Sequence, residues 1–158
     1  MIEKILRIIF PMSFLSKMLE IYLFFDRREK EAATGYVFYQ ENVLLIQQTY
    51  GEKKWTYPGG FIHTYETAEV GLRREVFEEV GLILGRTKLI EKTRDKRPHR
   101  NIVVHRFYAE AKTEAVVPDK VEVHEAQWVP IEKLKEFVSD DSYLKRALDL
   151  HRHYAHYS

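Results

Sequence analysis

The stretch that decides the fold of this chain is GFIHTYETAEVGLRREVFEEVGL, residues 60–82. Thr67 is a residue type that favours the N-cap of a helix, because its hydroxyl can accept a hydrogen bond from a free amide of the first turn. Gly81 can adopt the left-handed conformation that ends a helix. The pattern therefore predicts an α-helix between Thr67 and Gly81. Apolar residues at three-to-four-residue spacing mark the face that packs on a core: Leu72, Val76 and Val80.

Three glutamates lie together on another face of this predicted helix. Glu75, Glu78 and Glu79 stand at positions i, i+3 and i+4, so their carboxylates are neighbours. Each close pair of like charges costs a helix about 0.2–0.5 kcal/mol, and a bound cation would remove that cost. Carboxylate oxygens suit Mg²⁺ or Mn²⁺, and Mg²⁺ is commonly held by one or two carboxylates together with substrate phosphates. The sequence therefore predicts a Mg²⁺ or Mn²⁺ site for phosphate chemistry.

The spacing of the whole stretch resembles the Nudix box, G-x5-E-x7-R-E-U-x-E-E-x-G-U, where U is an aliphatic residue. Every specified position is filled, by Gly60, Glu66, Arg74, Glu75, Val76, Glu78, Glu79, Gly81 and Leu82. An acidic run alone is usually a solvated helix face, and a pair of glycines alone is merely a turn. The complete spacing favours a Nudix-type domain with a working site over that simpler interpretation.

The resemblance implies an activity and a fold. Members of the family hydrolyse a nucleoside diphosphate linked to another moiety, through attack of water on a phosphorus of the pyrophosphate. The expected substrate is therefore a small-molecule nucleotide or nucleotide derivative, and the expected cofactor is Mg²⁺ or Mn²⁺. The resemblance also implies a Nudix-like α/β/α sandwich with a mixed β-sheet. The order of the predicted elements agrees with this α/β class, because strands precede and follow the box helix and a further helix ends the chain.

The resemblance further implies roles for the charged residues of the box. Glu75 and Glu79 are expected to bind the metal directly, and Glu78 either binds it as a further ligand or orients the water. Arg74 resembles the family residue that pairs with a box carboxylate and holds it in place. Glu66 is expected to brace the loop or to bind the metal through water.

A further acidic residue is expected before the Trp-Val-Pro sequence at 128–130. In Nudix-like chains such a residue often completes the metal site or acts as the base, and Glu125 matches that place better than Glu122. The identity of the catalytic base is left open among four glutamates: Glu78, Glu79, Glu122 and Glu125.

The residues around the start of the box are candidates for substrate contacts. Gly59 and Gly60 would let the backbone approach the metal and the phosphates closely. Trp55, Tyr57 or Phe61 would be able to stack on a base, although core packing is the favoured use of each.

A basic loop at residues 93–100 lies between two predicted strands. Arg97, His99 and Arg100 are candidates for a phosphate or ribose contact. The alternative interpretation of this loop is a solvated hairpin tip.

Strand signals surround the box. Residues 33–39 and 43–48 are rich in β-branched, aromatic and aliphatic residues, with a hairpin turn at 40–42. The second run is nearly continuous, as in a strand buried on both faces. The remaining expected elements are strands at 83–92 and 101–112, a short helix at 131–137, and a last helix from about residue 142 capped by Asp140 or Asp141.

The N-terminal segment is the least typical part of the chain. We expect residues 1–31 to form an apolar helical extension and connector, and residues 32–158 to form the Nudix hydrolase domain. Residues 1–25 are too charged and too short to span a bilayer. They are expected to pack on the domain or on a second copy of the chain, which would give a homodimer. Contact with a membrane surface is not favoured, because the polar face is not rich in Lys and Arg.

Length and composition exclude several classes of protein. With 158 residues, 45% hydrophobic and 31% charged, the chain has the composition of one ordinary globular domain. Its net charge of +1 gives no general attraction for long nucleic acids, so none is expected as a partner. The absence of cysteine excludes disulfides and thiolate chemistry and agrees with the cytoplasm, where we expect the protein. The alternative from another class is a non-catalytic Nudix-like module that binds a nucleotide without cleaving it.

Overall fold

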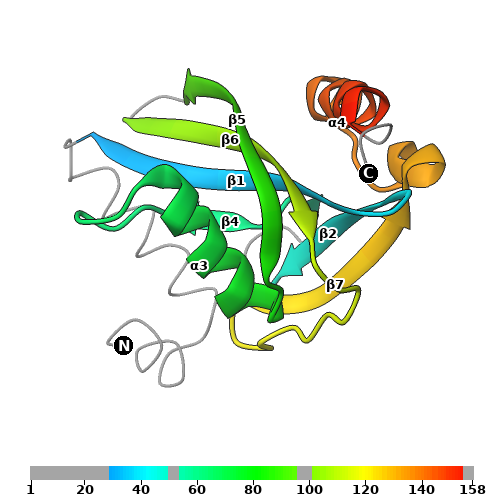
Figure 1. The fold of residues 1–158 in the computed structure, drawn as a ribbon, viewed down its shortest axis with the longest axis horizontal. Helices are drawn as coiled ribbons and strands as arrows, with labels where there is room; N and C mark the ends of the chain where they lie inside the picture. The colour runs from blue at the N-terminus through cyan, green and yellow to red at the C-terminus, as the bar shows by residue number, and fades with distance from the viewer. Residues whose placement is uncertain (1–28, 50–53, 96–100, 155–158) are drawn as a thin grey trace.

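A computed structural model of the chain describes residues 29–49, 54–95 and 101–154. Its elements follow one another along the chain (Figure 1) as β1 (Lys30–Tyr39), β2 (Asn42–Gln48), β3 (Trp55–Thr56), β4 (Gly59–Phe61), α3 (Ala68–Val80), β5 (Leu84–Arg94), β6 (Ile102–Ala111), β7 (Val123–Pro130), the 3-10 helix η1 (Ile131–Glu136) and α4 (Asp141–Tyr154).

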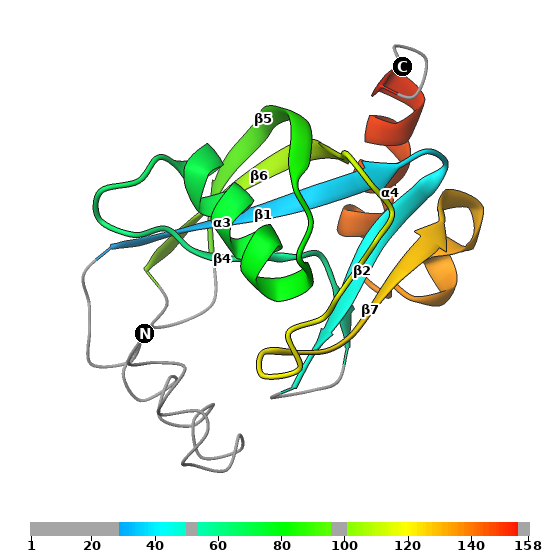
Figure 2. The same ribbon diagram turned by 60° about the horizontal axis from the view of Figure 1, so that its bottom comes forward.

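A mixed β-sheet forms the middle of this domain. The strands lie in the order β3-β2-β1-β6-β5, while β4 also pairs with β1 and β7 also pairs with β2. β1 runs parallel to β6, whereas the other pairs are antiparallel. The two views place α3 on one face of the sheet and α4 on the other (Figures 1 and 2). The predicted α/β sandwich with a mixed sheet is therefore confirmed.

Two hydrophobic cores lie on the two faces of the sheet, and the central strands contribute to both. Successive side chains of a strand point to opposite faces, so β1 places Val37 in the core beneath α3 and Tyr36 in the core beneath α4. We call these the α3 core and the α4 core. Residues 43–46 of β2 are fully buried and alternate between the cores in the same way. This confirms the prediction of a strand covered on both faces.

Helix α3 begins and ends at the predicted residues. Thr67 Oγ1 accepts a hydrogen bond from the amide of Val70 at 3.3 Å. Gly81 has φ of 72°, and its amide donates to the carbonyl of Phe77, so the left-handed residue closes the last turn. The apolar stripe is also confirmed, because Leu72, Val76 and Val80 are fully buried in the α3 core.

Several bounds differ from the prediction. β1 begins at Lys30 rather than Ala33, because the parallel pairing with β6 and the antiparallel pairing with β4 both extend it backwards. The predicted helix at 131–137 is a 3-10 helix. The expected helices at 1–25 lie outside the described residues. Of the helices that the structure does describe, none is both long and apolar enough to cross a membrane.

Candidate active site

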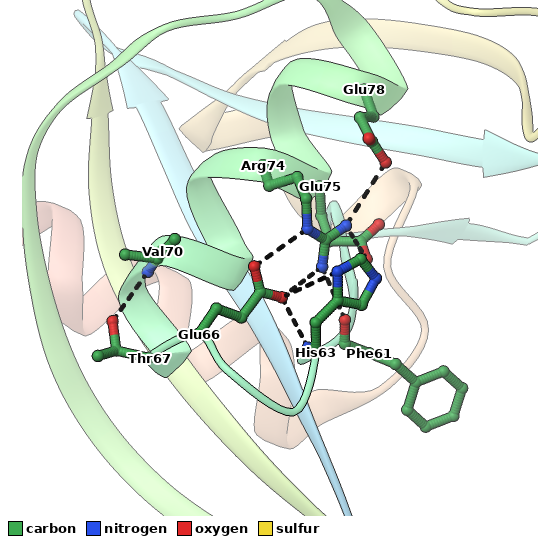
Figure 3. A network of polar contacts seen from close by, with 8 residues as sticks. All are labelled: Phe61, His63, Glu66, Thr67, Val70, Arg74, Glu75 and Glu78. Carbon is green, nitrogen blue, oxygen red and sulfur yellow. Dashed lines mark hydrogen bonds and ion pairs between the residues drawn. The ribbon is translucent and has the colours of Figure 1, made fainter. Parts of the chain in front are cut away.

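Arg74, in the middle of α3, is the centre of a polar network that joins the helix to the segment before it (Figure 3). Its Nη1 donates to Glu75 Oε1 at 2.8 Å, and its Nη2 donates to Glu66 Oε1 at 2.6 Å. A further bond from Nη2 reaches the carbonyl of Phe61 at 2.9 Å, and Nη1 lies 3.4 Å from Glu78 Oε2. One guanidinium therefore contacts three carboxylates and the backbone that precedes the helix, as the fixed fork of an arginine allows.

Glu66 holds the loop between β4 and α3. Its Oε1 accepts a hydrogen bond from Nη2 of Arg74, and its Oε2 accepts one from Nε of the same side chain. Oε1 also accepts the amide hydrogen of His63 at 2.7 Å. The hydrogen bonds from Arg74 lower the pKa of Glu66 to about 2, which keeps the carboxylate charged. Of the two roles left open for Glu66, this arrangement matches the bracing of the loop.

Glu79 is the most deeply buried carboxylate of the site, with 3% of the residue exposed. Its Oε2 accepts the amide hydrogen of Gly59 at 2.9 Å. Burial raises the pKa of Glu79 well above its usual value, and the nearby charges of Glu75, Glu122 and Asp119 act in the same direction. The side chain is therefore held beside other acids, where a cation would favour its charged form.

The two glycines of β4 lie directly against these carboxylates. Gly59 has φ of 144°, and a Cβ atom there would lie 2.1 Å from the carbonyl oxygen of Ala33. A Cβ atom on Gly60 would lie 2.5 Å from the carboxyl carbon of Glu75. Both positions thus exclude a side chain, so the close approach predicted for Gly59 and Gly60 is made to the acidic side chains of α3.

Glu75 is half-enclosed between Gly60 and Arg74. Burial raises its pKa, the contacts with Arg74 oppose that rise, and the charges of Glu122 and Glu78 add to it. Glu78 lies further out, with 43% of its side chain exposed. The three glutamates of the box therefore differ in environment, from the buried Glu79 to the solvent-facing Glu78.

The two candidate acids outside the box, Glu122 and Glu125, lie in different environments. Glu122 is partly buried, and its charge raises the pKa of both Glu75 and Glu79. Glu125 is an exposed residue of β7 opposite Gln47. A role for Glu125 stays a prediction, and the influence of Glu122 on two box carboxylates makes Glu122 the stronger candidate.

The donor set fits a hard divalent cation in its chemistry. Glu75 and Glu79 of α3 and Glu122 from the turn before β7 are carboxylates whose charges oppose one another in a partly buried place. In the described ranges, no group of three or more His, Asp or Glu side chains is already arranged as a set of metal ligands. Binding a metal would therefore require these side chains to draw together, which the removal of their repulsion favours.

A cleft of about 730 Å³ opens beside the glycines. It is lined by Gly59 and Gly60 and by the aromatic residues Trp55, Tyr57 and Tyr143. Phe61, the third aromatic residue considered for stacking, does not line this cleft and is 37% exposed. A planar group that enters the cleft would meet these aromatic residues and the two glycines.

Three predicted substrate contacts cannot be placed, and two residues near the site were not predicted. Arg97, His99 and Arg100 lie outside the described residues. Sequence reasoning missed two residues. One is Asp119, whose charge raises the pKa of Glu79, and the other is Tyr143, which lines the cleft. A signal for Asp119 did exist, because an aspartate side chain often accepts hydrogen bonds from backbone amides two to four residues later and so caps a turn.

Comparison with known proteins gives a family and a fold. The model of the NUDIX domain matches residues 29–148. The RNA pyrophosphohydrolases of Edwardsiella ictaluri and Serratia proteamaculans are similar over 56 residues, with 39% and 38% identity. The similar stretch is 35% of this chain and 32% of each relative, so it spans about a third of those proteins.

Solved structures resemble the domain over most of its length. A NUDIX-family hydrolase from Clostridium perfringens has a TM-score of 0.69, with 19% identity, over 78% of this chain and 96% of that one. A MutT structure from work on Aliivibrio salmonicida and Vibrio cholerae has a TM-score of 0.65, with 15% identity, over 77% of this chain and 98% of that one. At these identities the likeness concerns the fold alone, and it confirms the Nudix-like sandwich.

Proposed function

The chain belongs to the NUDIX domain family, and from that premise we propose that it hydrolyses a pyrophosphate bond with the help of a divalent metal ion. The substrate is a nucleoside diphosphate linked to another moiety, and the nucleophile is water. The observation that carries this proposal is that Glu75 and Glu79 lie against Gly59 and Gly60, two positions that leave no room for a side chain, while the charge of Glu122 raises the pKa of both carboxylates.

Each residue of the site has a proposed part in the reaction. Glu75 and Glu79 would hold Mg²⁺ or Mn²⁺, and the bound ion would neutralise the charge that develops on the phosphates. Arg74 keeps Glu75 in place through the hydrogen bond at 2.8 Å. Glu122 comes from outside the box, and its charge raises the pKa of both Glu75 and Glu79, which favours it as the acceptor of the proton of the attacking water. Glu78, exposed at the rim, would orient that water.

The cleft beside Gly60 supports a nucleotide as the substrate. Its aromatic lining suits the stacking of a base, which would place the attached phosphates toward the glycines and carboxylates. The relatives named as RNA pyrophosphohydrolases favour the 5′-triphosphate end of an RNA as one substrate to test. A nucleoside triphosphate or a nucleotide sugar presents the same bond in a smaller molecule.

The experiment is a hydrolysis panel with Mg²⁺, with Mn²⁺ and with a chelator. It includes nucleoside triphosphates, ADP-ribose, nucleotide sugars, dinucleoside polyphosphates and 5′-triphosphate or capped RNA. We expect cleavage of one class, abolished by the chelator. Glu79→Gln is expected to lower turnover about a hundredfold or more without loss of the fold. Near-normal turnover of Glu79→Gln would contradict the proposed site, and binding of a nucleotide without any cleavage would favour the non-catalytic module instead.

A further inference from the structure

The segment between β6 and β7 lies alongside the last turn of α3 (Figure 1). The amide of Val117 donates to the carbonyl of Val80 at 2.9 Å, and the amide of Asp119 donates to the carbonyl of Glu79 at 3.0 Å. The last carbonyls of a helix have no partner within the helix, so these bonds satisfy groups that would otherwise need water. The segment is thereby tied to the backbone of Glu79 itself.

The side chain of Asp119 holds the turn that follows. Its Oδ1 accepts the amides of Val121, Glu122 and Val123 at 3.0, 2.8 and 3.1 Å. Lys120, inside this turn, has φ of 63°, a left-handed conformation that a side chain rarely adopts without support. A single carboxylate oxygen therefore fixes three successive amides around Glu122, as capping aspartates do.

Thr49 holds the same turn from the other side. Its amide donates to the carbonyl of Glu122 at 2.9 Å, and its hydroxyl donates to the carbonyl of Val121 at 2.8 Å. Both backbone polar groups of Glu122 are thus bound, the amide by Asp119 and the carbonyl by Thr49. The backbone that carries the Glu122 carboxylate has little freedom to turn away from Glu75 and Glu79.

We propose that Asp119 is a positioning residue, whose Oδ1 holds Glu122 in register with Glu79 through the turn it caps. This inference rests on the proposed function, in which Glu122 takes part in hydrolysis. The alternative is that Asp119 acts through its charge as a further metal ligand. The two can be separated, because asparagine keeps the Oδ1 acceptor and loses the charge.

The experiment compares Asp119→Asn, Asp119→Ala, Glu122→Gln and the double variant Asp119→Ala/Glu122→Gln. Their Mn²⁺ affinity is measured by electron paramagnetic resonance, and kcat and KM are measured on the substrate that the panel identifies. Asp149→Ala is the matched control, because it removes an exposed carboxylate of α4 that pairs only loosely with Arg152 at 3.8 Å. Thermal unfolding of each variant reports whether the fold is kept.

Asp119→Ala is expected to lower kcat about tenfold or more, while Asp119→Asn and Asp149→Ala stay within about threefold of the wild type. The double variant is expected to be no worse than Glu122→Gln, because Asp119 acts through Glu122. Equal damage by Asp119→Asn and Asp119→Ala would overturn the proposal in favour of a direct role of the charge. So would a double variant in which the two losses multiply, or an Asp119→Ala variant that behaves as the wild type.

Amide hydrogen exchange keeps the test decisive in two further cases. If Asp119→Ala does not fold, Thr49→Val takes its place and is expected to show a smaller loss of the same kind. If the wild type hydrolyses nothing, the proposed function has failed, and exchange at Val121, Glu122 and Val123 still reports on the turn. Exchange at these amides is expected to be faster in Asp119→Ala and unchanged in Asp119→Asn. Equal exchange in all variants would overturn the role of Asp119 in the turn.

Discussion

At the scale of single residues, Glu79 is held where its charged form is disfavoured. The carboxylate is buried beside other acids, and its Oε2 accepts a hydrogen bond from the amide of Gly59 at 2.9 Å. Glu66 has the opposite environment, because Arg74 lowers its pKa to about 2. The site thus combines one carboxylate that braces the loop in its charged form with another whose charged form is disfavoured by burial.

This contrast predicts how stability depends on pH in the absence of metal. A group whose pKa is raised in the folded state contributes stability below its unfolded pKa and loses that contribution as the pH rises through the folded pKa. Burial raises the pKa of Glu79, so the ionised side chain is expected to destabilise the metal-free protein near neutral pH. In chelator, Glu79→Gln should therefore be more stable than the wild type near neutral pH. The difference should disappear below the usual glutamate pKa of 4.5.

Urea unfolding across this pH range checks the prediction. The matched measurement adds Mg²⁺, which should raise the stability of the wild type more than that of Glu79→Gln. A wild type that is more stable than Glu79→Gln at neutral pH in chelator would contradict the account.

A second prediction concerns Gly60, whose hydrogen atom points at Glu75. In Gly60→Ala the new Cβ atom would lie 2.5–2.7 Å from the carboxylate of Glu75, so that side chain must move. We expect turnover to fall about tenfold or more, because the proposed metal ligand Glu75 is displaced, while stability falls by only about 1–3 kcal/mol. Gly85→Ala is the control, since its Cβ atom would be 3.5 Å from the nearest carbonyl oxygen. Equal turnover of Gly60→Ala and Gly85→Ala would show that the contact with Glu75 is unimportant.

At the scale of elements, the site is assembled from α3, from β4 and from the turn before β7. α3 alone presents three glutamates, but the fourth acid comes from a turn that only the tertiary fold brings near. This predicts that the two candidate acids near β7 differ in effect. Glu122→Gln is expected to lower turnover about tenfold or more, whereas Glu125→Gln, on the exposed strand, is expected to change it by less than about threefold.

Steady-state hydrolysis of the two variants under one set of conditions tests this. Both replacements remove one negative charge within three positions of each other, so any general electrostatic effect is shared. The reverse order of the two effects would restore the original preference for Glu125.

The sequence predicted the elements better than it predicted how they meet. The bounds of α3 follow from Thr67 and Gly81, which act on their immediate neighbours in the chain. The parallel pairing of β1 with β6 could not be predicted in this way, because it depends on which distant strand is adjacent. Glu122 was named as a candidate, but Glu125 was preferred to it, because the place of Glu122 depends on Thr49 and on the end of α3. Local signals thus define the helix of the candidate site but do not choose between the two acids near β7.

At the scale of the whole molecule, the sheet makes the two cores depend on each other. β1 and β2 place alternate side chains in the α3 core and in the α4 core, so neither core can be lost while these strands remain packed. The two tryptophans report on different cores, because Trp128 packs against the α3 core and Trp55 packs against the α4 core.

This arrangement predicts a single cooperative unfolding transition. In the single-tryptophan variants Trp55→Phe and Trp128→Phe, the fluorescence midpoint in urea is expected to coincide with the midpoint from far-ultraviolet circular dichroism of the same variant. Separate midpoints within either variant would mean that the two faces of the sheet unfold independently.

The parallel pairing of β1 with β6 also has a consequence for the synthesis of the protein. Lys30 lies opposite Ile102, so β1 leaves the ribosome long before its partner exists. Until β6 follows, the apolar side chains of β1 and β2 have no complete sheet to enter, and such unpaired segments are prone to aggregate. A chain whose translation stops before residue 102 lacks β6 altogether. Such truncated products are therefore expected to be removed by proteolysis or to aggregate, and not to accumulate as folded protein.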